Sequence, residues 1–173
     1  MARELAERLH PRVERLGYLG EFFRCMAHQP KALLSFMQLT DDLKEALPDN
    51  LTEVVALTVA AATGNKYERN QHERLALKLK FPREWIRAVL ALEPASAKAL
   101  LEMEQAAQAL TLAAIRNQGR ACSKELERVV RAAGPEKSVA ILLLIGRYLS
   151  HAIVVNSLEL EPPVPSIFEE EKQ

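Results

Sequence analysis

The residues best suited to chemistry in this chain are Glu53, Glu68 and His72, with Tyr67 beside them. Glu68 and His72 are four residues apart in a predicted helix, so their side chains share one face of it. Glu53 is a lone carboxylate in an apolar segment, and a buried carboxylate must be paired, hydrogen-bonded or protonated. A carboxylate beside a histidine orients the imidazole and tunes its pKa, so this group predicts acid–base chemistry, with Tyr67 as a phenol donor.

Each of these residues also has an ordinary structural interpretation. Glu–His pairs at i,i+4 are common on exposed helix surfaces, and Glu53 lies in a first helical turn, where the helix dipole favours a carboxylate. A metal site built from Glu53, Glu68 and His72 would need a further ligand, and no second histidine stands at metal-ligand spacing. The sequence also lacks a glycine-rich phosphate loop, a nucleophile elbow and a zinc motif. We therefore expect no metal and no cofactor.

The elements that would position these residues are all helices, because Ala, Leu, Glu, Lys and Arg dominate the composition. Residues 51–63 are apolar on nearly every side, which predicts a central helix that Asn50 or Thr52 caps and Gly64 ends. Residues 67–80 form the next predicted helix. The other predicted helices are 2–9, interrupted by Pro11; 20–28; 30–46; 82–92; 95–117; 124–133, capped by Ser123; and 135–158, opened by Gly134-Pro135.

The predicted fold class is therefore all-α. We expect a single helical domain over residues 1–158 with its core motif at 48–92, followed by a Pro-rich, acidic, non-helical tail at 159–173. Residues 48–57 and 135–142 both consist of a proline, a polar cap and a small or branched apolar helix. This similarity fits either a duplicated helical hairpin or two ordinary buried helices.

The charge balance excludes strongly electrostatic partners. Lys plus Arg and Asp plus Glu number 23 each, so the net charge is zero and favours neither nucleic acid nor an anionic membrane. The longest apolar run, Val139 to Ile145, is too short to cross a bilayer, and no signal peptide opens the chain. We therefore expect a soluble cytoplasmic protein in which Cys25 and Cys122 are reduced and isolated.

Several other polar residues have weaker claims. His28 is most simply a helix-terminal residue and His10 a loop residue. Four polar side chains recur at roughly helical spacing on the last apolar helix, where core packing is the default and an orientation toward the site or an interface is the alternative: Arg147, Tyr148, His151 and Asn156.

The spacing of Glu53, Asn65, Glu68 and His72, with Gly64 in the turn, resembles the active-site turn and helix of the alkylhydroperoxidase D-like superfamily. The redox members of that superfamily carry Glu, eleven residues, Cys, two residues, Cys, three residues and His. Asn65 and Glu68 occupy the two cysteine positions here, so the chain has no thiolate to attack a peroxide. A second stretch, residues 26–30, resembles the family's Ala-His-x-Pro helix start.

Tyr67-Glu68 and His72 resemble instead the Tyr-Glu-Trp-x-x-His helix of the carboxymuconolactone decarboxylase branch. This resemblance implies an alkylhydroperoxidase D-like helical domain that forms a trimer or hexamer. It implies a cofactor-free lyase acting on a small carboxylated lactone or keto acid. His72 would then donate a proton, Glu68 would be its partner or base, Tyr67 would stabilise an oxyanion, and Glu53 would orient His72.

Two features separate this chain from that branch: the family tryptophan is replaced, and the chain is longer by a C-terminal hairpin and tail. Arg69 replaces the family tryptophan and would either bind a substrate carboxylate or lie in solvent as an ordinary helix residue. Asn65 is a second candidate for substrate binding. The alternative function is a non-catalytic, oligomeric scaffold or binding protein that kept the peroxidase-like fold without its redox cysteines. An enzyme is favoured if Glu53, Glu68 and His72 converge on a closed pocket, and the scaffold is favoured if they point into solvent.

Overall fold

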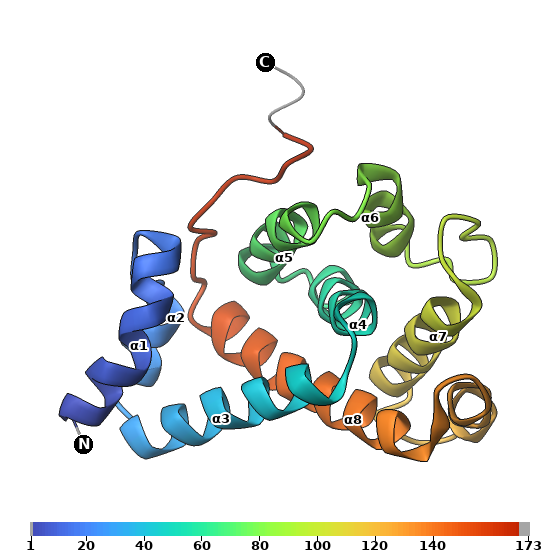
Figure 1. The fold of residues 1–173 in the computed structure, drawn as a ribbon, viewed down its shortest axis with the longest axis horizontal. Coiled ribbons are helices and arrows are strands. Elements are labelled where there is room, and N and C mark those ends of the chain that lie inside the picture. Colours follow the sequence, from blue (N-terminus) through green and yellow to red (C-terminus); the bar gives the residue numbers. More distant parts are fainter. Residues whose placement is uncertain (1, 170–173) are drawn as a thin grey trace. The chain divides into compact units, whose positions relative to one another are not determined.

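A computed structural model describes residues 2–169, which form eight α-helices and contain no strand. The all-α class predicted from the sequence is confirmed. The chain divides into two compact units, residues 1–42 and residues 43–173, and each is described by itself. The first unit contains α1 (Ala2–Leu16), α2 (Glu21–Met26) and most of α3 (Pro30–Ala46) (Figure 1).

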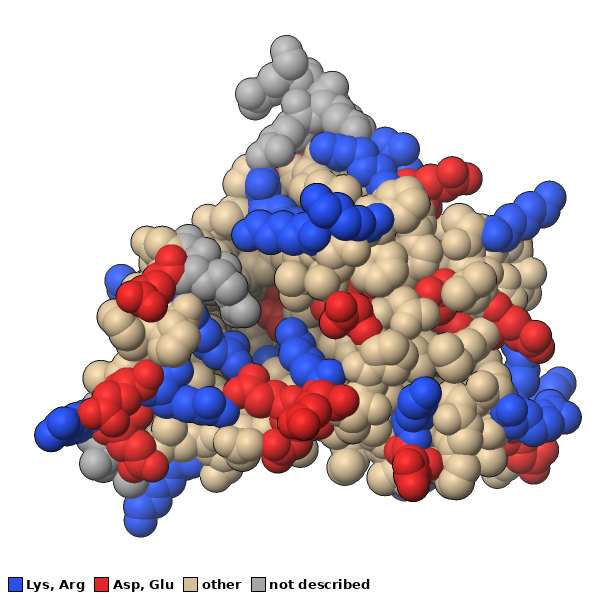
Figure 2. All heavy atoms as spheres, in the orientation of Figure 1, with Lys and Arg blue, Asp and Glu red and all other residues tan. Residues whose placement is uncertain are grey.

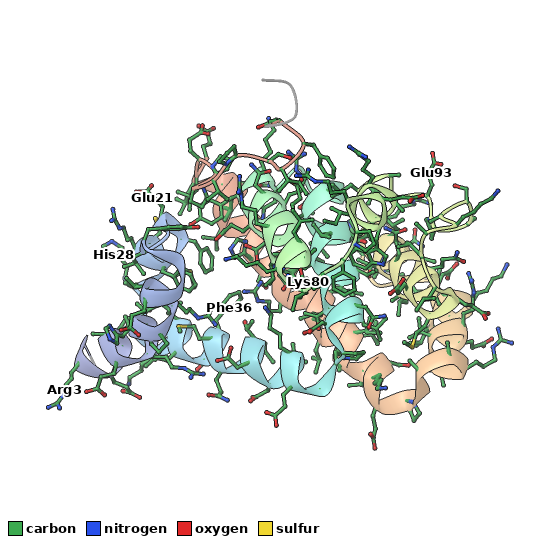
Figure 3. The ribbon with its side chains drawn as sticks, turned by 45° about the horizontal axis from the view of Figure 1, so that its top comes forward. Arg3, Glu21, His28, Phe36, Lys80 and Glu93 are labelled. Carbon is green, nitrogen blue, oxygen red and sulfur yellow. The ribbon has the colours of Figure 1, made fainter. Side chains whose placement is uncertain are left out.

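The first unit has a small apolar core of its own. Leu5 and Leu9 of α1 pack with Leu33 and Met37 of α3. The prediction that Pro11 interrupts the first helix is wrong, because α1 continues through it. Proline removes only one helical hydrogen bond, and burial of an apolar face stabilises a helix more than local propensity does. His28, labelled in Figure 3, is exposed in the turn after α2.

The second unit is arranged around one central helix. Its elements are α4 (Asp49–Ala62), α5 (Lys66–Lys78), α6 (Arg83–Leu90), α7 (Glu102–Arg116) and α8 (Ser123–Ser157). The four other helices all pack against α4, as Figure 1 shows. Every residue from Leu51 to Ala60 is buried, so the predicted central helix is confirmed. A polar side chain on α4 is therefore held inside the protein.

A tight turn joins α4 to α5 and fixes the start of the second helix. Gly64 adopts φ +68°, a left-handed conformation that glycine tolerates best, and it ends α4 as predicted. The Asn65 side chain then caps α5 by accepting a hydrogen bond from the Glu68 N–H at 3.0 Å. The predicted cap of α4 is wrong, because the helix already begins at Asp49 and both Asn50 and Thr52 lie inside it.

Two further boundaries differ from the sequence predictions. The helix predicted from residue 95 begins only at Glu102, because the Glu104 carboxylate accepts from the Leu101 N–H at 2.8 Å and fixes the helix start there. Ser123 is the first residue of α8 and not its cap. The predicted break at Gly134 is present as a kink inside α8, where that residue has φ +83° and ψ 167°.

Among the described residues, α8 is the one helix long and apolar enough to cross a membrane by length and composition. The sequence-based expectation had considered only the shorter apolar run within it. In the structure 56% of its most apolar window is buried inside the protein, as is usual for the core helix of a soluble protein. On the face in Figure 2 acidic and basic side chains are interspersed. The cytoplasmic location stays a prediction.

Substitution by alanine should change the stability of the protein in opposite directions at Gly64, in the turn before α5, and at Gly146, inside α8. Gly64→Ala should lower the free energy of unfolding by about 1 kcal/mol, because an added Cβ is strained at φ +68°. Gly146→Ala should raise it by about 0.5 to 1 kcal/mol, because that glycine is inside α8 and a Cβ there meets no atom within 4 Å. Urea unfolding at pH 7 measures both, and equal stability of Gly64→Ala and wild type would contradict the turn geometry.

Candidate functional site

The centre of the candidate site is a buried ion pair between α4 and α5. The Nδ1 atom of His72 lies 2.7 Å from Oε2 of Glu53, and the two side chains are only 8% and 2% exposed. Glu53 is thus not an exposed first-turn carboxylate. Because Nδ1 donates to Glu53, the other ring nitrogen, Nε2, points toward the remaining polar groups. Tyr148 Oη is 3.3 Å from that Nε2 atom, so α8 completes the surroundings of the imidazole.

Glu68 connects His72 to two further side chains of α8. Its Oε1 atom lies 3.5 Å from His72 Nε2 and accepts from Arg147 Nη1 at 3.2 Å. Its Oε2 atom lies 3.1 Å from His151 Nε2. One buried carboxylate therefore has an arginine and two histidines around it. The Arg147 guanidinium also lies over the Tyr148 ring, 4.3 Å from its centroid, which holds both side chains in place.

The hydrogen-bond network assigns a tautomer to His151. Asn65 Oδ1 accepts from the Glu68 N–H, so the amide must present its Nδ2 donor to His151 Nδ1, 3.3 Å away. That Nδ1 atom is therefore an acceptor, and the proton of neutral His151 is on Nε2, from which it is donated to Glu68 Oε2. Asn65 thus caps α5 and orients His151 with one side chain.

The two histidines have opposite pKa shifts. Burial favours the neutral form of both rings. At His72 the carboxylates of Glu53 and Glu68 outweigh burial and raise the pKa to about 9. At His151 burial, together with the positive charges of Arg147 and His72, outweighs the attraction of Glu68 and lowers the pKa to about 4. At neutral pH the site therefore contains one imidazolium and one neutral imidazole.

Glu68 remains ionised despite its burial. Desolvation alone would raise its pKa, but His151, His72 and Arg147 together hold the pKa of this carboxyl well below its usual range. The Glu68 carboxylate contacts both the His72 imidazolium and the Arg147 guanidinium, and each of these cations stabilises its charged form. The His72 imidazolium has two N–H groups, and Nε2–H is the one that is not bound to Glu53, so proton transfer is most readily initiated there.

The structure brings together most, but not all, of the residues predicted from the sequence. Glu53, Glu68, His72 and Asn65 converge as described. Tyr67 is buried, and its ring lies 6.0 Å from that of His151, so it borders the network next to that residue. Arg69 differs. Its Nε atom lies 3.2 Å from Glu73 Oε1, and its guanidinium also contacts Asn70.

For three polar side chains of α8 the sequence favoured a role in core packing over a role in the site. Arg147, Tyr148 and His151 in fact contact Glu68 or His72. The available signal was the presence of such polar residues, one helical turn apart, in an otherwise apolar helix. Asn156, the fourth residue noted, donates instead to the Thr63 carbonyl at 2.9 Å and ties α8 to the turn between α4 and α5.

No metal-binding arrangement is found in the part of the chain that the structure describes. There, no group of three histidine, cysteine or carboxylate side chains is placed to hold an ion. The site's own cations, the His72 imidazolium and Arg147, balance its carboxylates instead. Cys25 and Cys122 are both free thiols. Cys25 belongs to the first unit, and Cys122 precedes α8 in the second.

Comparisons with known proteins agree with this fold. Residues 30–114 match the model of the carboxymuconolactone decarboxylase family. No curated protein sequence matches the chain. A peroxidase-related protein from Ralstonia eutropha, solved as an alkylhydroperoxidase AhpD core, is 16% identical with a TM-score of 0.78, over 92% of this chain and 85% of that one.

Two other solved structures are similar. The debrominase Bmp8, in complex with 2,3,4-tribromopyrrole, is 18% identical with a TM-score of 0.76, over 92% of this chain and 87% of its own. A protein of unknown function from Agrobacterium tumefaciens is 15% identical with a TM-score of 0.73, over 81% of this chain and 96% of its own. At such identities the structures share the fold. The family model covers 85 of the 173 residues, and over that part the chain is similar to the carboxymuconolactone decarboxylase family.

The charge state of His72 can be measured directly. We expect its ring resonances to titrate in NMR spectra with a midpoint near pH 9. In Glu53→Gln the midpoint should fall by more than about 1 unit, because the nearest carboxylate is gone while burial still favours the neutral ring. A wild-type midpoint near 6.5 that ignores this substitution would mean that the Glu53–His72 pair does not form.

Stability should depend on pH on both sides of neutrality. The folded-state pKa of His72 lies above the ordinary histidine value of 6.5, so its contribution to stability is complete below about pH 6.5 and is lost as pH rises through about 9. The pKa of His151 is lowered to about 4, so stability is lost as pH falls from about 6.5 toward 4. Urea midpoints measured from pH 4 to 10 should peak near pH 6 to 7. His72→Gln should flatten the alkaline limb, and His151→Gln the acid limb.

Proposed function

We propose that the protein is a lyase of the decarboxylase type that acts without a cofactor on a small carboxylated lactone or keto acid. The observation that carries the proposal is the buried chain from Glu53 through His72 to Glu68. A decarboxylation breaks the carbon–carboxylate bond, releases carbon dioxide and leaves an electron pair on carbon or on a conjugated oxygen. The enzyme must hold the substrate carboxylate, stabilise this anion and return a proton to carbon.

His72 is suited to return the proton. Its pKa of about 9 keeps Nε2 protonated at neutral pH, and Glu53 fixes the ring so that this nitrogen faces away from α4. Transfer of that proton to carbon leaves a neutral imidazole that still donates from Nδ1 to Glu53. The ionised Glu68, in contact with Nε2, stabilises the imidazolium that forms again when the ring takes up a proton from water for the next cycle.

The groups from α8 support the other two tasks. Tyr148 Oη, near His72 Nε2, is a better placed donor to a developing oxyanion than Tyr67, whose ring neighbours His151. Arg147 is a better placed cation for a substrate carboxylate than Arg69, because Arg147 already contacts a carboxylate inside the site. The substrate carboxylate would then share Arg147 with Glu68.

The alternative remains a non-catalytic, oligomeric scaffold or binding protein. It is favoured by a specific observation: both oxygens of Glu68 and both ring nitrogens of His72 and of His151 already have polar partners within the protein. A network whose polar groups all bind one another can have a purely structural role. The two functions differ in whether removal of His72 or Tyr148 abolishes a reaction or only lowers stability.

The decisive assay measures release of carbon dioxide from a panel of small carboxylated lactones and β-keto acids. With an active substrate, His72→Gln should lower kcat by about 10²- to 10⁴-fold, the usual contribution of a general acid. Tyr148→Phe, which removes only a hydroxyl group, should lower it by about 10- to 10³-fold. Treatment with a chelator should leave the rate unchanged.

The matched control is His28→Gln, because His28 is an exposed histidine in the first unit. This variant should decarboxylate the substrate at the wild-type rate. If no substrate on the panel is decarboxylated, or if a folded His72→Gln protein keeps its full rate, the lyase assignment fails and the scaffold is favoured. Turnover of an organic hydroperoxide that disappears in Cys25→Ser or Cys122→Ser would instead indicate thiol chemistry.

We also propose that the protein self-associates as a trimer or hexamer through α8. One face of that helix exposes four large apolar side chains: Val139, Leu142, Leu143 and Ile153. Gly146 and Ser150 lie between them on the same exposed face. A continuous apolar stripe of this kind is unfavourable in water and is well suited to packing against a second copy.

Sedimentation tests this assembly. At micromolar concentration the mass should be about three or six times the 19.4 kDa of one chain. Leu143→Glu places a charge on the exposed stripe and should dissociate the oligomer while leaving the helical content unchanged. A wild-type mass near 19.4 kDa would contradict the proposal.

A further inference from the structure

The segment that follows α8 returns to α5 and is fastened there by side chains of that helix. Glu73 Oε2 accepts from Ser166 Oγ at 2.6 Å and from the Ile167 N–H at 3.0 Å. Asn70 Nδ2 donates to the Val164 carbonyl at 2.9 Å, and Arg74 Nη2 donates to the Pro165 carbonyl, also at 2.9 Å. We refer to residues 164–168 as the strap. In Figure 1 it leads away from the end of α8.

The strap is anchored by its side chains as well as by its backbone. Ile167 is 2% exposed and is part of the main apolar core of the second unit. Phe168 lies under the Arg87 guanidinium, 4.9 Å from ring centroid to Cζ, and Arg83 donates to the Ile167 carbonyl at 3.0 Å. An isoleucine inserted in the core and several bonds to backbone carbonyls define a specific seat on α5 and α6 for an extended segment.

The strap and the candidate site hold opposite faces of α5. Successive residues of an α-helix are rotated by about 100°, so positions 70, 73 and 74 share one face. Glu68 and His72 lie on the other side, toward α4 and α8. The helix that carries both site residues is therefore fixed between the strap on one side and the buried ion pairs on the other.

We propose that the strap positions α5 for the candidate site and that Glu73 is its main positioning residue. Glu73 is a carboxylate that is 1% exposed, one residue after His72, and its Oε2 atom binds the strap at two points. Loss of the strap leaves this face of α5 unsupported. The His72 ring then moves relative to Glu53 and Glu68, and water reaches the pair. The proposal concerns the geometry of His72 and holds whether or not the protein is a lyase.

The test alters the strap in the full-length chain and leaves α5 and the site residues unchanged. In the double variant Ser166→Ala, Ile167→Ala, the NMR titration midpoint of His72 should fall from near pH 9 toward 6.5 by at least about 1 unit. A more hydrated, displaced pair with Glu53 raises the histidine pKa less. Ser166→Ala alone removes one hydroxyl group, so this protein should fold and show a smaller shift in the same direction.

A matched control separates positioning from general loss of stability. Leu110→Ala removes a fully buried side chain of α7, a helix that contributes no residue to the site, and should lower Tm without moving the His72 midpoint. A synthetic peptide of residues 161–173, added in excess to the double variant, should occupy the vacated seat and restore the midpoint. If both strap variants lower Tm but titrate at His72 as the wild type does, the strap only covers the core and the proposal is wrong.

Discussion

The buried contact between Glu53 and His72 is the constraint to which the rest of the second unit is adapted. Removing two charged groups from water is costly unless their geometry is good and their remaining polar atoms are satisfied. The 2.7 Å contact meets the first condition, and Tyr148 and Glu68 meet the second at Nε2. Because α4 is covered by four helices, the Glu53 side chain cannot reach solvent. Its partner, His72, must therefore be positioned beside it inside the protein.

Glu68 extends this requirement to the last helix. A second carboxylate beside the first pair needs positive charge of its own, and Arg147 supplies it from a position 79 residues further along the chain. His151 stays neutral and contributes a hydrogen bond without adding charge. Where redox members of the superfamily have two cysteines, this chain therefore has a cap, Asn65, and a carboxylate, Glu68, that are bound to each other and to α8.

The sequence predicted the parts of this arrangement that depend on local chemistry. The spacing of Glu53, Glu68 and His72 predicted that these side chains meet. Gly64 and Gly134 marked real changes of direction because a positive φ favours glycine. It did not reveal Arg147, Tyr148 and His151 as site residues, since their partners are distant in the chain. Pro11 and the start of α7 were mispredicted because tertiary burial and one glutamate side chain outweighed local propensity. The proline-rich tail likewise gave no sign that Ile167 enters the core.

The position of α8 and the strap at the end of the chain has a consequence for synthesis. Ribosomes deliver the chain from its N-terminus, and α4 and α5 emerge with their two glutamates and His72 long before the residues that complete the network. Contacts across 76 to 94 residues must close last, and loop closure over such distances slows folding. Until then the nascent chain holds an unbalanced carboxylate next to an uncovered apolar helix. This intermediate is the species that molecular chaperones would be expected to bind.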